Sequence, residues 1–186
     1  PELTGANVPF AVRARVCLLR DLGSALAPDN AFAIIQGLET VALRMKQHCQ
    51  NAEKVVNFLK KHKEVTKVIY STEHEKKIAD RAKQYLKGGN GPMVGIELKG
   101  GIDAGKKFIE SLKMFYHVAN IGDARSLAIH PASTTHSQLN EKELAASGVT
   151  QSYVRLCIGI EHIDDIIDDL DQALNKSSKG NLKAVS

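Results

Sequence analysis

Tryptophan is absent from this sequence of 186 residues, and aromatic residues make up only 5% of it. Large rings can therefore fill little of the interior, so Leu, Ile, Val and Ala must supply most of the buried surface. A chain of this length can bury roughly 70% of the surface that its unfolded form exposes. The sequence thus predicts a sizeable core that is built mainly from aliphatic side chains.

Cysteine is scarce, and long apolar runs are missing. Cys17, Cys49 and Cys157 are widely spaced, odd in number and outside any C-x-x-C pair, which favours free, mostly buried thiols in a reducing compartment. No apolar run approaches the roughly 20 residues needed to cross a bilayer. Residues 1–4 do not resemble a secretory signal peptide. We therefore expect a cytoplasmic protein without a membrane partner.

A strong charge of either sign is also lacking. The 25 Lys and Arg residues exceed the 21 Asp and Glu residues by a formal net charge of +4. The lysines between residues 60 and 77 are interspersed with Glu64, Glu73 and Glu75. This mixture of charges is typical of a solvated surface. No basic stripe carries interleaved aromatic residues, so we do not expect nucleic acid as a partner.

The first 62 residues have a helical pattern. One helix is expected over residues 11–20 and ends at Gly23, and a second begins at residues 28–30 and continues to about residue 62. Gly37 weakens the second helix locally. Its apolar residues recur at intervals of three and four and form a continuous seam: Leu38, Val41, Ala42, Met45, Cys49, Ala52, Val56 and Leu59. We expect this seam to pack lengthwise against a sheet or a partner.

Shorter elements follow. Strands are expected over residues 65–70, 93–98, 115–121 and 153–160, and a polar loop over residues 122–140. Three helices are expected among them: one capped by Ser71 or Thr72 that contains Ile78, one over residues 103–113, and a final one that contains Ile163, Ile166, Ile167, Leu170 and Leu174.

This element order predicts an α+β fold, that is, an α/β sandwich with a small sheet of about four mainly antiparallel strands and helices packed on one face. The sequence does not set the strand order. We divide the chain into an amino-terminal helical arm with a long interdomain helix (residues 1–62), a small α+β domain (63–175) and a polar tail (176–186).

One charged residue interrupts the last strand. Val154 and Leu156 alternate with Arg155 and Cys157, so the two pairs face opposite sides of the sheet. A guanidinium is a planar fork that can bind both oxygens of a carboxylate. From this pattern alone, Arg155 is either a carboxylate-binding residue or an ordinary exposed arginine of a strand.

Several motifs together resemble the Cys/Met-metabolism family of pyridoxal-phosphate enzymes. The most specific are NIGDARSL at residues 120–127, HPASTTHS at 130–137 and VRLCIGIE at 154–161, and the segments at 19–23, 26–32 and 37–45 continue the likeness. Nearly the whole chain is covered. The likeness is greatest to the O-acetylhomoserine sulfhydrylase branch, because Asn120 stands where the γ-lyases usually have serine.

The resemblance implies the small domain of a fold type I enzyme, which closes over an amino-acid substrate beside a larger cofactor domain. The implied cofactor is pyridoxal phosphate. In the family, the lysine that forms the Schiff base lies in a motif like S-x-T-K, and no lysine of this chain lies in such a motif. Lys67 is in the most similar local sequence, and we interpret it as a surface residue. The implied partners are the substrate and either further copies of the chain or a missing amino-terminal portion.

The implied reaction is a γ-replacement that makes homocysteine, or methionine, from O-acetylhomoserine and sulfide, or methanethiol. We expect this chain alone to be inactive, with no catalytic residue of its own. The alternative is a non-catalytic dimerisation or regulatory module with the same fold, which the apolar seam fits equally well.

The resemblance also assigns roles to individual residues. Arg155 is expected to bind the substrate carboxylate with help from Asn120, and Ser133 and Thr135 are expected to line the substrate entrance. His130 and His136 lack a third ligand at a recognisable spacing, so we expect them to order the loop rather than bind a metal. Cys157 has no histidine partner nearby in the sequence, which argues against a nucleophile.

Overall fold

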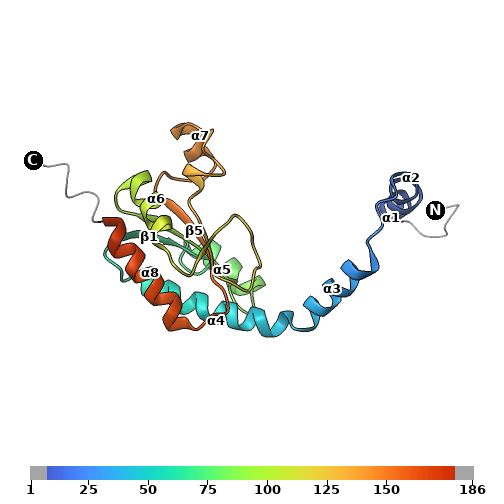
Figure 1. Cartoon of the computed structure of the whole chain (residues 1–186), viewed down its shortest axis with the longest axis horizontal. Helices are drawn as coiled ribbons and strands as arrows, with labels where there is room; N and C mark the ends of the chain where they lie inside the picture. The colour runs from blue at the N-terminus through green and yellow to red at the C-terminus, as the bar shows by residue number, and fades with distance from the viewer. Residues whose placement is uncertain (1–7, 179–186) are drawn as a thin grey trace, which may run out of the picture. The chain divides into compact units, whose positions relative to one another are not determined.

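The computed structural model describes residues 8–178 (Figure 1). The chain divides into two compact units, Pro1–Ala42 and Leu43–Ser186. The amino-terminal helices are α1 (Pro9–Arg13), the π-helix η1 (Ala14–Leu19), α2 (Arg20–Leu22) and α3 (Pro28–Glu39). The remaining elements are α4 (Val41–Leu59), β1 (Val65–Ile69), α5 (Lys76–Tyr85), β2 (Met93–Leu98), α6 (Gly101–Ser111), β3 (Tyr116–His117), β4 (Leu127–Ile129), η2 (Pro131–Ser133), α7 (Glu141–Ala146), β5 (Tyr153–Cys157) and α8 (Ile163–Ser177).

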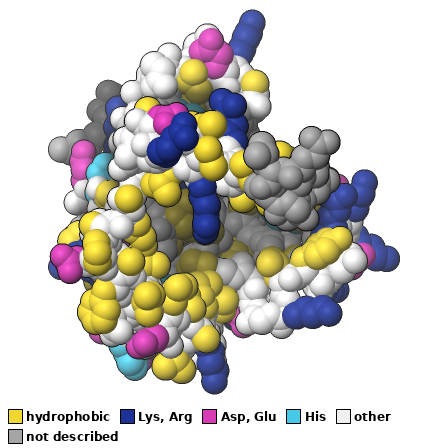
Figure 2. Space-filling view, turned by 90° about the vertical axis from the view of Figure 1, so that its right-hand side faces the viewer, with side chains coloured by type: hydrophobic (Ala, Val, Ile, Leu, Met, Phe, Trp, Pro, Cys, Tyr) yellow, Lys and Arg dark blue, Asp and Glu magenta, His cyan; other side chains and the backbone are white. Residues whose placement is uncertain are grey.

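The helices before residue 40 bury none of their side chains. Phe10, Leu22 and Leu38 are among the large apolar residues that are exposed there, and hydrophobic side chains occupy much of the face seen in Figure 2. Gly23, at φ 70°, ends α2 in the left-handed conformation that glycine adopts readily. The predicted stop at this residue is therefore confirmed.

The predicted continuous helix from residue 28 to about residue 62 is wrong. Thr40 separates α3 from α4 with φ −110° and ψ 5°, outside the helical region, whereas Gly37 stays inside α3. The break thus occurs at Thr40 and not at Gly37, the residue at which the sequence analysis expects the helix to be weakest. The second half of the predicted seam is buried, because Cys49, Ala52, Val56 and Leu59 of α4 are inaccessible to solvent or nearly so.

The sheet has five strands in the order β1-β2-β5-β4-β3. All neighbouring pairs are antiparallel except β3 and β4. The predicted α+β class with mainly antiparallel pairing is confirmed, with one strand more than expected. The additional strand is β4, which lies inside the predicted polar loop of residues 122–140. Its three residues are all buried, but a run this short shows no periodicity that sequence reasoning could use.

Three strands are shorter than predicted, and β1 is so by one residue, because it ends at Ile69. β3 contains only Tyr116 and His117 of the expected 115–121, because the chain turns at Val118, whose N–H donates to the carbonyl of Tyr116. β5 ends at Cys157 rather than at residue 160, because Ile158 and Ile160 donate to carbonyls outside the ladder. The loop after β3 returns along the sheet to the start of β4, where the N–H of Ile160, in the segment after β5, donates to the carbonyl of Ala124. Both segments form part of the candidate site.

One face of the sheet is covered by α4, α6 and α8, as predicted. Val94, Ile96 and Leu98 of β2 and Val154 and Leu156 of β5 have exposed fractions of 3% or less. They form one cluster with residues of the three helices, among them Ala52, Val55, Leu59, Phe108, Ile166, Leu170 and Leu174. The core is therefore mainly aliphatic, as the scarcity of aromatic residues indicated, with Tyr70, Phe108 and Phe115 as its buried rings. The alternating residues of both strands point to the opposite face.

The helix boundaries correct several expectations. α5 begins at Lys76 after Glu75 and has no side-chain cap, so neither Ser71 nor Thr72 caps it. α6 begins at Gly101, two residues before the predicted start, and α7 was not predicted although Asn140 and Glu143 form a capping box that the sequence contains. α8 includes Lys176 and Ser177, which we had assigned to the tail, and residues 179–186 of that tail lie outside the described residues.

Within residues 8–178, no helix is both long enough and apolar enough to cross a bilayer. Cys49 and Cys157 are buried and Cys17 is exposed, and all three are free thiols.

Candidate functional site

Arg155 lies in the middle of β5, on the face of the sheet that the helices leave open. Leu156, the next residue, is fully buried in the core, so the alternation of the strand directs Arg155 the other way. Its neighbours across the ladder are Gly95 on β2 and Ile129 on β4. The sequence-based prediction of which face Arg155 occupies is thus confirmed.

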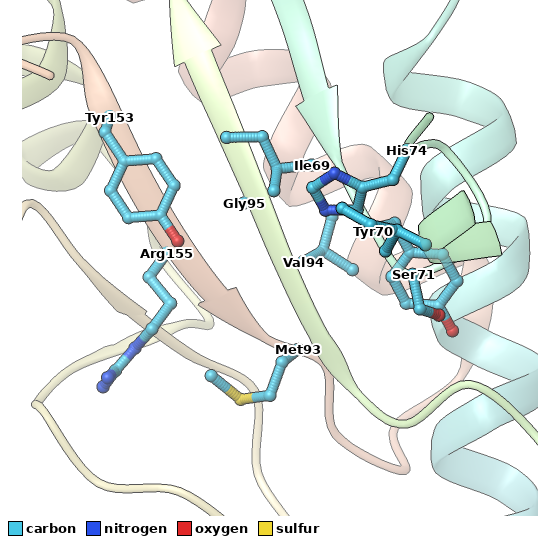
Figure 3. Close-up of a pocket in the computed structure, with 10 residues that line it drawn as sticks. Ile69, Tyr70, Ser71, His74, Met93, Val94, Gly95, Tyr153 and Arg155 are labelled. Atoms are coloured by element: carbon cyan, nitrogen blue, oxygen red, sulfur yellow. The ribbon is translucent and has the colours of Figure 1, made fainter. Parts of the chain in front are cut away.

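A pocket of about 370 Å³ lies along this open face (Figure 3). It is formed by the end of β1 and the turn after it, by α5, and by the central strands β2 and β5. Its lining includes Ser71, His74, Ile78, Met93, Tyr153 and Arg155. The wall is mostly apolar, with Arg155 as its only formally charged residue apart from the titratable His74. Such a mixture suits a small molecule that carries an anionic group.

The guanidinium of Arg155 has one hydrogen-bond acceptor and no ion pair within the described part of the chain. Its Nη2 donates to the carbonyl of Ala119 over 2.8 Å. No carboxylate of residues 8–178 lies within ion-pair distance of it. Because a guanidinium has five N–H donors, most of them are available to a ligand. A structural salt bridge therefore does not account for this arginine.

Asn120 directly follows the carbonyl that Arg155 contacts. It lies in the exposed segment that leaves β3, so the structure brings Arg155 to the loop to which Asn120 belongs. The two residues that the sequence analysis assigned to carboxylate binding are therefore neighbours, although 35 positions separate them in the chain.

Glu161 anchors the same loop at its other end. Its carboxylate accepts from the backbone N–H of Ser126 over 2.7 Å and from the Ser126 hydroxyl over 2.9 Å. A Cβ on Gly159 would collide with the Glu161 carboxylate and with the backbone of Ser126. The tight contact therefore needs glycine at this position. Sequence reasoning missed Glu161, because only the fold shows which backbone groups its carboxylate reaches.

Two buried polar residues of α4 hold the chain after β5. His48 Nδ1 is 2.7 Å from the carbonyl of Ile158, and Asn51 Nδ2 donates to the carbonyls of Gly159 and Glu161. Buried polar groups that are fully paired give a segment one defined position. Together with Glu161, these residues join α4, the end of β5 and the loop beside Arg155. His48 follows the segment 37–45 that carries part of the family resemblance, but the sequence predicted this contact for neither His48 nor Asn51.

Asp123, Arg125 and Tyr116 form an exposed cluster near the start of β4. Arg125 pairs with Asp123 over 3.0 Å and lies 4.4 Å from the centre of the Tyr116 ring. The side-chain hydrogen bond from Arg125 lowers the pKa of Asp123 to about 2. These two charges satisfy each other, so neither is available to pair with Arg155.

Ser133 and Thr135 do not line the pocket of Arg155. Ser133 lies in η2 with its hydroxyl 2.8 Å from His130 Nδ1, and it lines a separate pocket of about 320 Å³ with Lys106 and His117. Thr135 is exposed, and its hydroxyl is 2.9 Å from His136 Nδ1. The structure thus brings Arg155 and Asn120 together and leaves Ser133 and Thr135 apart from them.

His130 is buried and bonded at both ring nitrogens. Besides Ser133, it contacts the carbonyl of Gln151 through Nε2 over 2.8 Å. Burial lowers the pKa of His130 from the ordinary 6.5, so its ring favours the neutral form. No group of three metal-ligating side chains occurs within residues 8–178. Cys157 is 2% exposed. His130 and Cys157 are therefore both packed inside the domain.

The pocket does not have the residues that pyridoxal phosphate requires. No lysine is among the residues that line it, and a Schiff base to this cofactor needs a lysine amine. The arginine and the apolar wall match the carboxylate end of an amino acid instead. We therefore assign no part of cofactor binding to this pocket.

The chain is similar to known enzymes over most of its length. A family model described as Cys/Met metabolism PLP-dependent enzyme matches residues 6–175. The chain is 51% identical to an O-acetyl-L-homoserine sulfhydrylase of Leptospira meyeri over 171 residues, and 41% identical to an L-methionine gamma-lyase of Fusobacterium nucleatum subsp. polymorphum. These matches cover 91% of this chain, but 39% and 43% of the two relatives.

A solved structure from Campylobacter jejuni, described as an O-acetylhomoserine (thiol)-lyase with a pyridoxyl-lysine, superposes with a TM-score of 0.83 at 43% identity. The match covers 91% of this chain and 41% of that one. The chain therefore spans about two fifths of the length of the relatives that it matches. The family model, the relatives and the shared fold agree: this chain belongs to the family of Cys/Met-metabolism enzymes that depend on pyridoxal phosphate.

Proposed function

We propose that this chain is the substrate-binding small domain of an enzyme that makes homocysteine from O-acetylhomoserine and sulfide, or methionine when methanethiol is the nucleophile. The branch is supported by identity, which is 51% and 49% to two sulfhydrylases and 41% to a γ-lyase. Because the chain spans about two fifths of these relatives, the complete activity belongs to the proposal. Pyridoxal phosphate, when bound, withdraws electrons from the amino acid so that protons can leave it.

The observation that carries the proposal is the unpaired guanidinium of Arg155 at the open face. Its Nη2 bond to the Ala119 carbonyl fixes the orientation of the group, and the remaining N–H donors can bind both oxygens of a carboxylate. Asn120, which follows Ala119 in the chain, is proposed to add a donor. Holding the carboxylate in this way orients the substrate, which is the contribution that a positioning group makes to a reaction rate.

The rest of the assignment follows from this role. No residue of the chain is proposed as catalytic, and the chain without a Schiff-base lysine from elsewhere is expected to be inactive. Ser133 and Thr135 are proposed to line the substrate entrance when the domain closes. A cytoplasmic location also remains part of the proposal, as does a partner that is either a further copy of the chain or a missing amino-terminal portion. The exposed apolar residues between positions 8 and 45 support such a partner, because they are numerous enough to need covering.

The second candidate is a dimerisation or regulatory module. The same exposed apolar residues favour it, but it gives no role to an unpaired arginine in a pocket. The two functions differ in whether the chain recognises a free amino acid through its carboxylate, and a binding experiment separates them.

The test uses the complete gene product that carries this chain, loaded with pyridoxal phosphate, and two ligands that cannot undergo γ-replacement. L-norleucine carries the α-carboxylate, and pentylamine is the same molecule without it. We expect Arg155→Gln to weaken norleucine binding on the order of 10- to 100-fold, the value of a charge-assisted contact, and to leave pentylamine binding unchanged. Calorimetry measures both.

Arg81→Gln is the matched control, because Arg81 is exposed on α5 and does not line the pocket. Arg155→Lys keeps the charge without the planar fork and should fall between the parent and Arg155→Gln. Equal norleucine affinity in Arg155→Gln and the parent would remove carboxylate recognition from the proposal and favour the regulatory module.

A further inference from the structure

Gly95 leaves a gap beside Arg155 on the open face of the sheet. The two residues are direct partners across the β2–β5 ladder, where paired Cβ atoms normally lie about 4.5–5.5 Å apart and support each other. Glycine supplies no side chain at this place, so the stem of Arg155 lacks its usual neighbour on the β2 side.

The ring of Tyr153 fills that gap. Tyr153 precedes Arg155 by two residues and shares its face, and both line the pocket in Figure 3. A Cβ built on Gly95 would lie 2.6 Å from Cε2 of Tyr153 and 2.9 Å from its hydroxyl oxygen. The hydroxyl end of the ring therefore occupies the space that a side chain at position 95 would take.

The stem of Arg155 is thus enclosed on two sides. Ile129, its partner on β4, is buried, and the tip of Tyr153 lies over β2. The guanidinium extends out of this enclosure to the carbonyl of Ala119. Without the ring, the side chain of Arg155 could tilt across Gly95 onto β2 and lose that contact.

The hydroxyl of Tyr153 forms no hydrogen bond with any group of residues 8–178. Burial raises the pKa of Tyr153, and the charge of Arg155 acts in the opposite direction, so the hydroxyl is neutral near pH 7 and lies within the electrostatic reach of the guanidinium. A neutral ring can support the arginine stem without competing for its charge.

We infer that Tyr153, packed over Gly95, is a positioning residue that keeps Arg155 directed toward the Ala119 loop. The inference rests on the proposed function, because it assigns to Tyr153 the orientation of the group that binds the carboxylate. The ring of Tyr153, rather than its hydroxyl, supports Arg155. Substrate affinity therefore also requires that position 95 carries no side chain.

The test measures norleucine and pentylamine binding in four variants of the complete gene product loaded with pyridoxal phosphate. Tyr153→Ala removes the ring, Tyr153→Phe keeps it, and Gly95→Ala displaces its tip without removing any group. We expect Tyr153→Ala and Gly95→Ala to weaken norleucine binding about tenfold and to leave pentylamine binding within about twofold. Tyr153→Phe should stay within about twofold of the parent for both ligands.

The fourth variant combines Tyr153→Ala with Arg155→Gln. Because the ring acts through the arginine, the double variant should bind norleucine no more weakly than Arg155→Gln alone. Equal weakening of both ligands by Tyr153→Ala, or an additive effect in the double variant, would overturn the positioning role. So would unchanged norleucine binding in Tyr153→Ala and Gly95→Ala while Arg155→Gln weakens it. If Arg155→Gln itself has no effect, the proposed function fails and this inference fails with it.

Discussion

The two faces of the sheet are made by the same strands but differ in function, because one packs against helices and the other lines a pocket. On one face, Val154 and Leu156 are fully buried against α4, α6 and α8. On the other face, Tyr153 and Arg155 of the same strand line an open pocket. The alternation of a β-strand thus separates residues that stabilise the fold from residues that bind a ligand. Stability and affinity should therefore respond to different substitutions one position apart.

The largest effect should come from the helix-covered face. Leu156→Ala leaves a cavity in a fully buried position, which costs about 2–5 kcal/mol of unfolding free energy. Native-state hydrogen exchange at the β5 amides measures the free energy of unfolding of the sheet. Met93→Ala on the open face of β2 is the control and should cost clearly less, because Met93 is partly exposed. Equal losses of unfolding free energy in Leu156→Ala and Met93→Ala would show that the two faces contribute equally to stability.

A smaller loss is expected at a polar contact on the same side. Asp169 of α8 is buried, and its carboxylate accepts from the backbone N–H groups of Lys113, Met114 and Phe115. Asp169→Ala leaves these donors unpaired, so we expect a loss of about 2–3 kcal/mol by the same measurement. Asp168→Ala, at the exposed neighbouring residue, should change the free energy of unfolding by less than about 0.5 kcal/mol. A similar loss in both would show that charge, not the hydrogen bonds, is responsible.

A weaker, pH-dependent effect is expected at His130. Burial lowers its pKa in the folded protein below the ordinary 6.5, and Lys106 and His117 act in the same direction. The unfolded chain therefore binds the proton more tightly, so this contribution to stability is complete above pH 6.5 and falls as the pH drops below that value. Urea unfolding between about pH 7.5 and pH 5 should show this slope, and His130→Asn should reduce it. An unchanged slope in the variant would contradict the prediction.

The smallest change in stability should come from the open face. Arg155→Gln removes one hydrogen bond to a loop carbonyl at an exposed site, so the free energy of unfolding should change by less than about 0.5 kcal/mol. The same variant is expected to lose most of its affinity for an amino-acid carboxylate. Hydrogen exchange at the β5 amides provides the measurement. A loss comparable to that of Leu156→Ala would mean that Arg155 is a structural residue.

Local patterns predicted several elements well, although the longest of them, over residues 28–62, hid the break at Thr40. The alternation around Arg155 identified both β5 and the face that the arginine occupies, and the apolar positions of α8 identified its buried side. β2 was predicted with its observed bounds, because Gly91 and Pro92 mark its start and Gly100 its end. These elements carry their own local signals.

The rest of the site depends on contacts between distant segments. β4 is three residues long and gives no periodic signal. The hydrogen-bond partner of the Glu161 carboxylate lies 35 positions away in the chain, and one acceptor of Asn51 lies 110 positions away. The role of Gly95 is visible only when the position of Tyr153 is known. No local pattern encodes such pairs, since the register of the strands decides which residues meet.

A crystal structure of the complete gene product with bound L-norleucine shows whether the Arg155 guanidinium binds the carboxylate of an amino acid. We expect two N–H···O contacts of about 2.7–2.9 Å between Arg155 and the two carboxylate oxygens, with the bond to Ala119 retained. A carboxylate bound elsewhere, with Arg155 still contacting only the Ala119 carbonyl, would contradict this expectation.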